Sequence, residues 1–206
     1  MLESCIAFSL AAFLLAISPG PDNIFVLTQS VARGARYGIA VASGLITGCI
    51  FHTSLVALGF AVILRDNEWL LLLIKIFGAI YLLFLAYKVY QSDGSIHLEE
   101  NTTNHQSWWK LYRVGITMNL LNPKVTLFFL ALLPQFVVPG AMEEWIQIYI
   151  LGGIFMLVSL ITFYLIAFLG GSVARFIRSS SWFGPAMKWT QIIVFVGIAV
   201  VIFVID

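Results

Sequence analysis

Two ten-residue stretches decide how this chain folds: AISPGPDNIF at residues 16–25 and MNLLNPKVTL at residues 118–127. Each places proline among polar residues inside an otherwise apolar run. Proline lacks a backbone N–H and clashes with the carbonyl four residues earlier, so it breaks or kinks a helix. In hydrocarbon the freed carbonyls must find another partner. We therefore expect two interrupted membrane helices, and the residues at the two breaks are Pro19, Gly20, Pro21 and Pro123.

The composition around these stretches is that of an integral membrane protein. Of the 206 residues, 61% are hydrophobic and 10% are charged, against roughly 45–50% and about 25% in soluble domains. Disorder is excluded, because it needs low hydrophobicity and high net charge. A net charge of +1 leaves no basic face for nucleic acid. Cys5 and Cys49 lie alone in apolar runs, so we expect no disulfide framework, no metal site and no cofactor.

Six stretches reach the roughly 20 apolar residues that a helix needs to cross a bilayer. They are residues 4–31, 38–64, 69–90, 114–138, 145–171 and 186–205. All six tryptophans lie near the ends of these stretches, as is typical of residues at a membrane–water interface. Ala40, Gly44 and Gly48 form a stripe of small residues that favours close helix packing and is also compatible with a sliding interface. The predicted fold class is all-α, with six transmembrane helices.

The distribution of lysine and arginine predicts the orientation. One set of alternate connections holds eight basic residues: Arg33, Arg36, Lys88, Lys110, Arg113, Arg175, Arg178 and Lys188. The other set holds Arg65. Because basic loops stay in the cytoplasm, we expect both termini of this multi-pass protein outside it.

A polar segment at residues 91–112 divides the chain. It is predicted to be a cytoplasmic loop between a first three-span repeat, residues 1–90, and a second, residues 113–206. Three spans are an odd number, so the second repeat enters the membrane in the opposite sense. Inverted repeats with interrupted spans in corresponding positions are typical of secondary transporters.

Two opposite charges, Asp22 and Lys124, each follow a proline directly. An ionised residue at mid-membrane costs about 2.5–3.5 kcal/mol on insertion scales, so such residues are usually functional. Superposing Pro21 on Pro123 makes the two charges equivalent and predicts that they face each other. A zwitterion would fit between them, with its ammonium toward Asp22 and its carboxylate toward Lys124 and a helix start at Asn122. A purely structural ion pair is the alternative.

The candidate substrate-binding residues are Asp22, Asn23, Asn119, Asn122 and Lys124, and Asp22 is also the candidate proton-coupling residue. Four more residues would line the same cavity if their helix faces turn inward: Gln29, His52, Lys75 and Gln135. Each of these four residues also has a purely structural interpretation. Lys75 can extend to the outer surface, His52 can be a hydrogen-bonded interior residue rather than a proton relay, and both glutamines can bond between helices.

Several motifs resemble the LysE/RhtB family of bacterial amino-acid exporters over nearly the whole chain. They are SPGPD at residues 18–22, RG at 33–34, His52, KIFGAIYLL at 75–83, NLLNPK at 119–124 and LPQF at 133–136. The resemblance implies six spans in the cytoplasmic membrane and efflux of small amino acids or their derivatives, driven by an ion gradient. The threonine/homoserine branch is the most similar.

These features bear on three classes of function: an enzyme, a channel or structural subunit, and a transporter. An enzyme is disfavoured, because the spans hold one histidine and no carboxylate besides Asp22. A passive channel or structural membrane subunit is the alternative, since broken helices also build pores. We expect a proton antiporter with alternating access, whose partners are a small zwitterionic substrate, the coupling proton and the lipid bilayer. A second copy of the chain, in a homo-oligomer, is a further candidate partner.

Overall fold

The computed structural model describes residues 1–18, 20–59, 67–92, 107–180 and 182–204. Within these ranges the chain is helical and contains no strand. The α-helices are α1 (Leu2–Ile17), α2 (Pro21–Arg33), α3 (Ala35–Gly59), α4 (Glu68–Gln91), α5 (Trp108–Leu120), α6 (Pro123–Leu127), α7 (Glu144–Phe168), α8 (Gly170–Ser179) and α9 (Phe183–Val204). A π-helix, η2 (Phe128–Leu132), and a 3₁₀ helix, η3 (Leu133–Phe136), follow α6.

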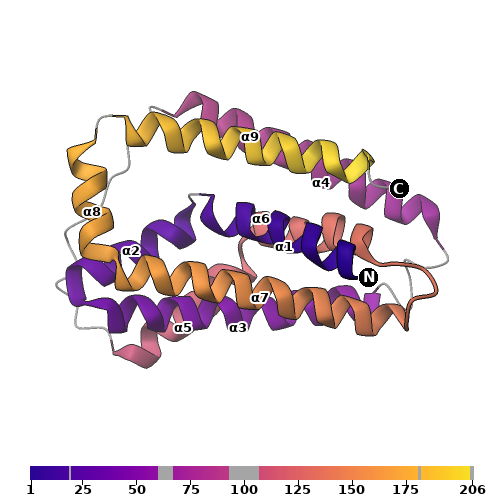
Figure 1. Ribbon diagram of the computed structural model, residues 1–206, viewed down its shortest axis with the longest axis horizontal. Coiled ribbons are helices and arrows are strands. Elements are labelled where there is room, and N and C mark those ends of the chain that lie inside the picture. The colour runs from indigo at the N-terminus through magenta and orange to yellow at the C-terminus, as the bar shows by residue number, and fades with distance from the viewer. Residues whose placement is uncertain (19, 60–66, 93–106, 181, 205–206) are drawn as a thin grey trace.

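Most of these helices run along the long axis of the molecule (Figure 1). Helix α3 packs against α5 and α7, and α1 packs against α7. Helices α4 and α9 form an antiparallel pair on the other side, which meets the rest of the chain mainly at η2. Both termini lie at the same end of the molecule, and α8 crosses the opposite end.

Two helix pairs are sharply bent at the proline motifs. The axes of α1 and α2 differ by 59°, and the axis of α5 differs by 50° from that of the helical segment Pro123–Phe136. Among the described residues, four helices are long and apolar enough to cross a membrane alone, and six spans result if each bent pair counts as one. The structure therefore supports a helical membrane protein with four to six spans.

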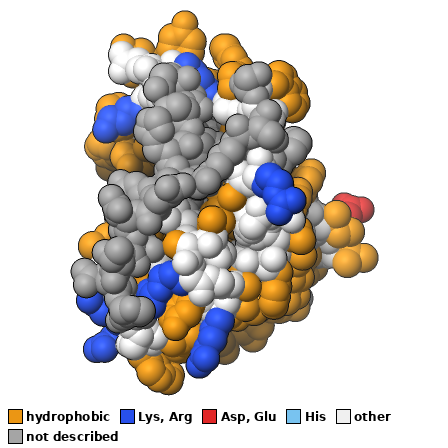
Figure 2. All heavy atoms as spheres, turned by 90° about the vertical axis from the view of Figure 1, so that its left-hand side faces the viewer, with side chains coloured by type: hydrophobic (Ala, Val, Ile, Leu, Met, Phe, Trp, Pro, Cys, Tyr) orange, Lys and Arg blue, Asp and Glu red, His pale blue; other side chains and the backbone are white. Residues whose placement is uncertain are grey.

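Helix α7 ends close to the expected boundary of the fifth span. The sequence predicts a span to about residue 171, and α7 ends at Phe168, after which α8 begins at Gly170 as a separate helix. Helix α8 alternates apolar and basic residues with helical periodicity, which is typical of a helix at an interface rather than across a bilayer. The end of the molecule that α8 crosses carries several lysine and arginine side chains (Figure 2).

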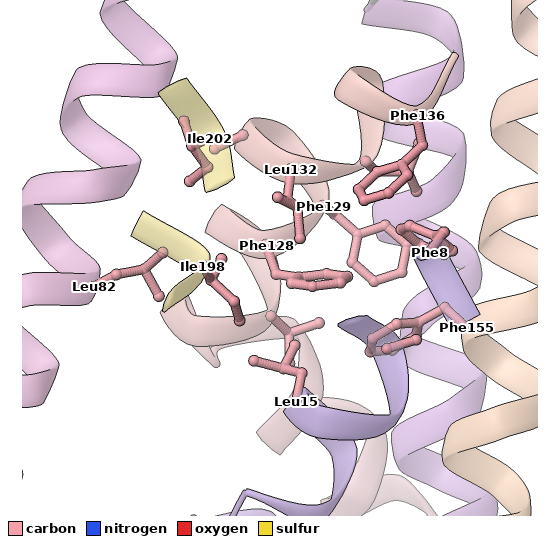
Figure 3. Close-up of a cluster of buried hydrophobic side chains, with 14 of the residues drawn as sticks. Phe8, Leu15, Leu82, Phe128, Phe129, Leu132, Phe136, Phe155, Ile198 and Ile202 are labelled. Carbon is pink, nitrogen blue, oxygen red and sulfur yellow. The ribbon is translucent and has the colours of Figure 1, made fainter. Parts of the chain in front are cut away.

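The largest hydrophobic cluster lies where η2 meets α1, α7 and the α4–α9 pair (Figure 3). Phe128 and Phe129 both contact the Phe155 ring, at centroid distances of 5.3 Å and 4.9 Å. Phe8 lies edge-on to Phe136 at 5.2 Å. Lipid is as apolar as these side chains, so close packing rather than the hydrophobic effect stabilises such contacts in a membrane. This cluster holds the second bent segment against α1.

The predicted stripe of small residues packs closely on α5. A Cβ atom at Gly44 would overlap the carbonyl oxygen of Tyr112, and one at Gly48 would come within 2.5 Å of the Asn119 Oδ1 atom. In return, a Cβ at Gly115 would overlap the Val41 carbonyl. These glycines let the α3 and α5 backbones approach closely, and they bring Asn119 at the end of α5 beside the middle of α3.

Candidate functional site

A small cavity lies between the two breaks. Its lining residues are Leu15, Ala16, Asp22, Asn23, Leu45, Ile46, Cys49, Asn119, Lys124, Val125, Phe155, Ser159 and Phe163. The space available to the centres of water-sized molecules is about 20 Å³, enough for about one water. Residues from both proline motifs thus line the same cavity as residues from α3 and α7.

Asn122 joins the two breaks. It is the N-cap of α6, and its Oδ1 atom accepts a hydrogen bond of 3.0 Å from the backbone N–H of Lys124. Asparagine is favoured at this position because its oxygen satisfies an N–H that has no partner inside the helix. Its Nδ2 atom donates to the Asp22 Oδ2 atom at 2.7 Å. One side chain therefore starts the second half of the second bend and holds the carboxylate of the first.

Lys124 fills the gap left by the first break. Its ammonium donates to the carbonyl oxygens of Leu15 and Ser18, both at 3.2 Å. The residue four positions after Leu15 is Pro19, which has no N–H to offer that carbonyl. The same ammonium lies 5.4 Å from the centre of the Phe195 ring on α9, within cation–π range. Lys124 thereby ties the end of α1 to α6 and α9.

Asp22 is buried, with 8% of its surface exposed. Its Oδ2 atom is bonded to Asn122, but its Oδ1 atom has no hydrogen-bond partner. The carboxylate and the Lys124 ammonium attract each other electrostatically, while each is hydrogen-bonded to neutral groups. An unpartnered, buried carboxylate oxygen is rare in a native protein and calls for an explanation.

Two other cavity-lining residues carry unpartnered oxygens, the Asn119 Oδ1 atom and the Ser159 Oγ atom. The backbone carbonyl of Asn119 has no N–H four residues later, because that residue is Pro123, and it accepts from the Asn122 backbone N–H at 3.0 Å instead. It also accepts a hydrogen bond from the Nε2 atom of His52, 3.2 Å away. The cavity therefore combines three unsatisfied oxygens with one ammonium, in walls that are otherwise mostly apolar.

The remaining predicted residues fall into three groups: one residue that lines the cavity, four residues that do not, and the residues of the first break. Asn23 lines the cavity and donates from its Nδ2 atom to the Ala16 carbonyl at 2.8 Å. The cavity lining does not include four other candidates, Gln29, His52, Lys75 and Gln135. Gly20 is the N-cap of α2 and Pro21 its first residue, and Pro19 lies outside the described residues.

Each of the four residues outside the cavity has its own surroundings. His52 is buried, and the centre of its ring lies 5.8 Å from that of the tilted Phe129 ring. Lys75 is buried, with 9% of its surface exposed. Gln135 donates to the Ala131 carbonyl at 3.2 Å, and Gln29 is buried.

Nine cavity residues have no counterpart among the sequence candidates: Leu15, Ala16 and Val125 beside the breaks, and six residues on α3 and α7. Helix α3 contributes Leu45, Ile46 and Cys49, and α7 contributes Phe155, Ser159 and Phe163. Both helices are rich in apolar residues around their circumference, so hydrophobic periodicity does not indicate which of their residues line the cavity. Among the described residues, no group of three or more histidine, cysteine or acidic side chains is placed to hold a metal ion.

Comparison with known proteins adds to this geometry. Residues 13–205 match the family model described as LysE type translocator. The chain is 32% identical, over 84% of its length and 82% of the relative's, to a homoserine/homoserine lactone efflux protein of Salmonella typhimurium, and 33% identical, over the same shares, to the protein of that name in Salmonella typhi. It is 29% identical, over 84% of both chains, to an uncharacterized membrane protein of Vibrio cholerae. No solved structure matches. The chain belongs to the LysE translocator family.

Proposed function

We propose that this protein exports small amino acids or short derivatives, such as threonine, homoserine or similar compounds, across the bacterial inner membrane. The observation that carries the proposal is the cavity between the two bends, where the unpartnered Asp22 Oδ1 and Asn119 Oδ1 atoms share a space with the Lys124 ammonium. Membership of the LysE family and the names of the two Salmonella relatives support the substrate class.

A zwitterion is complementary to these groups. The substrate ammonium donates to the free Oδ1 atoms of Asp22 and Asn119. The substrate carboxylate accepts from Lys124, whose ammonium then exchanges the carbonyls of Leu15 and Ser18 for a charged partner. Hydrogen bonds between charged groups are stronger than those to neutral carbonyls. Asn122 positions Asp22 through its bond of 2.7 Å, and Asn23 holds the end of α1 at the Ala16 carbonyl.

Asp22 supplies a route to proton antiport. Its Oδ1 atom can hold a substrate ammonium or a proton, and the two exclude each other. When a proton arrives from outside, it displaces the substrate, and when the protein next faces the cytoplasm, a new substrate displaces the proton. Exchange at one atom is thus enough to couple export to the proton gradient. Catalysis of a chemical reaction is not part of this mechanism.

Alternating access follows from the size of the cavity. A space of about 20 Å³ holds about one water, so helices must separate before an amino acid can enter. We propose that each bent pair is one interrupted span, and that residues 1–90 and 113–206 are two inverted repeats that move against each other. Loop 91–112 and the basic end of the molecule (Figure 2) would face the cytoplasm, and both termini would face outside.

Counterflow in proteoliposomes tests the proposal against a passive channel. Liposomes loaded with unlabelled substrate are diluted into a trace of labelled substrate, over a panel of amino acids that includes homoserine, threonine and homoserine lactone. A carrier accumulates label transiently and saturably, whereas a channel equilibrates it without overshoot. Overshoot with at least one small amino acid is expected. Its absence across the panel would remove the exporter proposal, and equilibration without saturation would favour the channel.

A further inference from the structure

We propose that Ser159 is a specificity-determining residue, whose hydroxyl recognises the hydroxyl of a short substrate side chain. The inference rests on the proposed export function. It concerns the cavity residues that do not bind the ammonium or the carboxylate of the substrate. The charged lining residues, Asp22 and Lys124, belong to the two bends. The lining residues on α3 and α7 form a second wall, which consists of Leu45, Ile46, Cys49, Phe155, Ser159 and Phe163.

Ser159 stands out among the hydroxyl groups buried in the helices. Such groups in membrane helices commonly bond to the carbonyl four residues earlier. Ser30 does so with Val26 at 2.7 Å, and Thr53 does so with Cys49 at 2.8 Å. On α7 itself, Thr162 bonds to the Val158 carbonyl at 2.8 Å. Ser159 is 1% exposed and lines the cavity, and its Oγ atom has no partner.

The neighbours of Ser159 define what it can recognise. Phe155 lies one helical turn before it and Phe163 one turn after it, so an isolated hydroxyl lies between two rings that offer no hydrogen bond. An unpaired hydroxyl in apolar surroundings is unfavourable, and a ligand that pairs with it removes this cost. When its ammonium and carboxylate are bound at the bends, the side chain of an amino acid occupies the rest of the same cavity, which Ser159 lines.

This wall fits a particular chemical class of side chain. A short chain ending in a hydroxyl satisfies the Ser159 Oγ atom, whereas an aliphatic chain of the same length leaves it unpaired. A site that bonds to a substrate hydroxyl rejects the analogue without it far better than an apolar site rejects an added hydroxyl. Ser159 therefore favours hydroxylated amino acids over their deoxy counterparts.

The test compares two substrates that differ by one hydroxyl, homoserine and 2-aminobutyrate. Purified wild-type protein and variants are reconstituted, and the ratio of kcat/KM for the two substrates is measured by counterflow. For Ser159→Ala the ratio should fall about tenfold, the effect of one neutral hydrogen bond. The fall should come from homoserine, with 2-aminobutyrate transported as before. Ser159→Thr keeps a hydroxyl and should keep most of the ratio.

Thr162→Val is the matched control, because it removes a buried hydroxyl from the same helix whose bond is internal. It should leave the ratio unchanged. An unchanged ratio in Ser159→Ala, or an equal loss for both substrates, would overturn the role of Ser159 while leaving the exporter proposal intact. Failure of the wild type to transport any amino acid would instead reject the proposed function, so the two failures are distinguishable.

Discussion

The Asn122 side chain donates a 2.7 Å hydrogen bond to the Asp22 carboxylate, across a sequence separation of 100 residues. Each residue flanks a proline that ends or begins a helix, Pro21 in the first bend and Pro123 in the second. The bond fixes one oxygen of the carboxylate and leaves the other without a partner. The two bends thus form one polar unit at the centre of an apolar protein.

The Asp22→Asn variant distinguishes proton coupling from the exchange of substrate across the membrane. The amide keeps the shape of the side chain but cannot carry a transferable proton, so export driven by a pH gradient should fall to the level of empty liposomes. Counterflow at saturating substrate should persist with a KM about 10–100-fold higher, since a hydrogen bond to a charged group contributes about 1.5–3 kcal/mol. Transport in reconstituted vesicles measures both quantities. Gradient-driven export equal to wild type would remove Asp22 from the coupling mechanism.

Lys124→Met tests recognition of the substrate carboxylate. Homoserine has a free carboxylate, whereas homoserine lactone has it closed into an ester and offers no negative charge to Lys124. The variant should therefore raise the KM for homoserine about 10–100-fold and change the KM for the lactone much less. Lys110→Met, at an exposed position on α5, is the control and should affect neither substrate. Equal losses for the two compounds would favour a structural role for Lys124 at the Leu15 and Ser18 carbonyls.

His52→Gln decides between an interior hydrogen bond and a proton relay. The partner of His52 is the Asn119 carbonyl, which can only accept, so the Nε2 atom is the donor. A glutamine amide can donate in its place but cannot carry a proton through the membrane. We expect export driven by a pH gradient to stay within about threefold of wild type, a change below 1 kcal/mol. Loss of coupling with counterflow retained would assign His52 to a relay.

Gly44→Ala tests the close approach of α3 and α5. The added methyl group would overlap the backbone carbonyl of Tyr112, which cannot move aside as a flexible side chain can. Overpacking of this kind costs about 1–3 kcal/mol, so the melting temperature in detergent should fall by several degrees. Gly153→Ala on α7, where a Cβ has no atom within 4 Å, is the control and should melt as the wild type does. Equal melting of the two variants would contradict the packing described.

Cys49 reports on opening of the cavity. It is 1% exposed and lines the cavity, whereas Cys5 is partly exposed on α1. In a Cys5→Ser background, a small methanethiosulfonate reagent should modify Cys49 slowly, and saturating homoserine should slow the reaction further by occupying the space. The rate is followed by mass spectrometry, with Cys5→Ser/Cys49→Ser as the blank. Labelling that is fast and indifferent to every transported substrate would place Cys49 outside the transport path.

The sequence alone predicts the helical membrane class, the starts of two helices and the candidate site. Its apolar composition indicates a helical membrane protein, because only helices and closed barrels satisfy the backbone in lipid. The prolines at positions 21 and 123 fix where α2 and α6 begin, since they lack the N–H that a helix interior requires. The positions of Asp22 and Lys124 beside them single out the candidate site, because a charge in an apolar run is costly.

Tertiary structure alone decided the partners and the walls of that site. The Leu15 and Asn119 carbonyls accept hydrogen bonds from side chains more than 60 positions away, those of Lys124 and His52. Helices α3 and α7 are rich in apolar residues around their circumference, so no periodicity shows that Ser159 and Cys49 face the cavity. Local sequence sets where a helix begins and bends, but long-range packing sets which of its uniform faces turns inward.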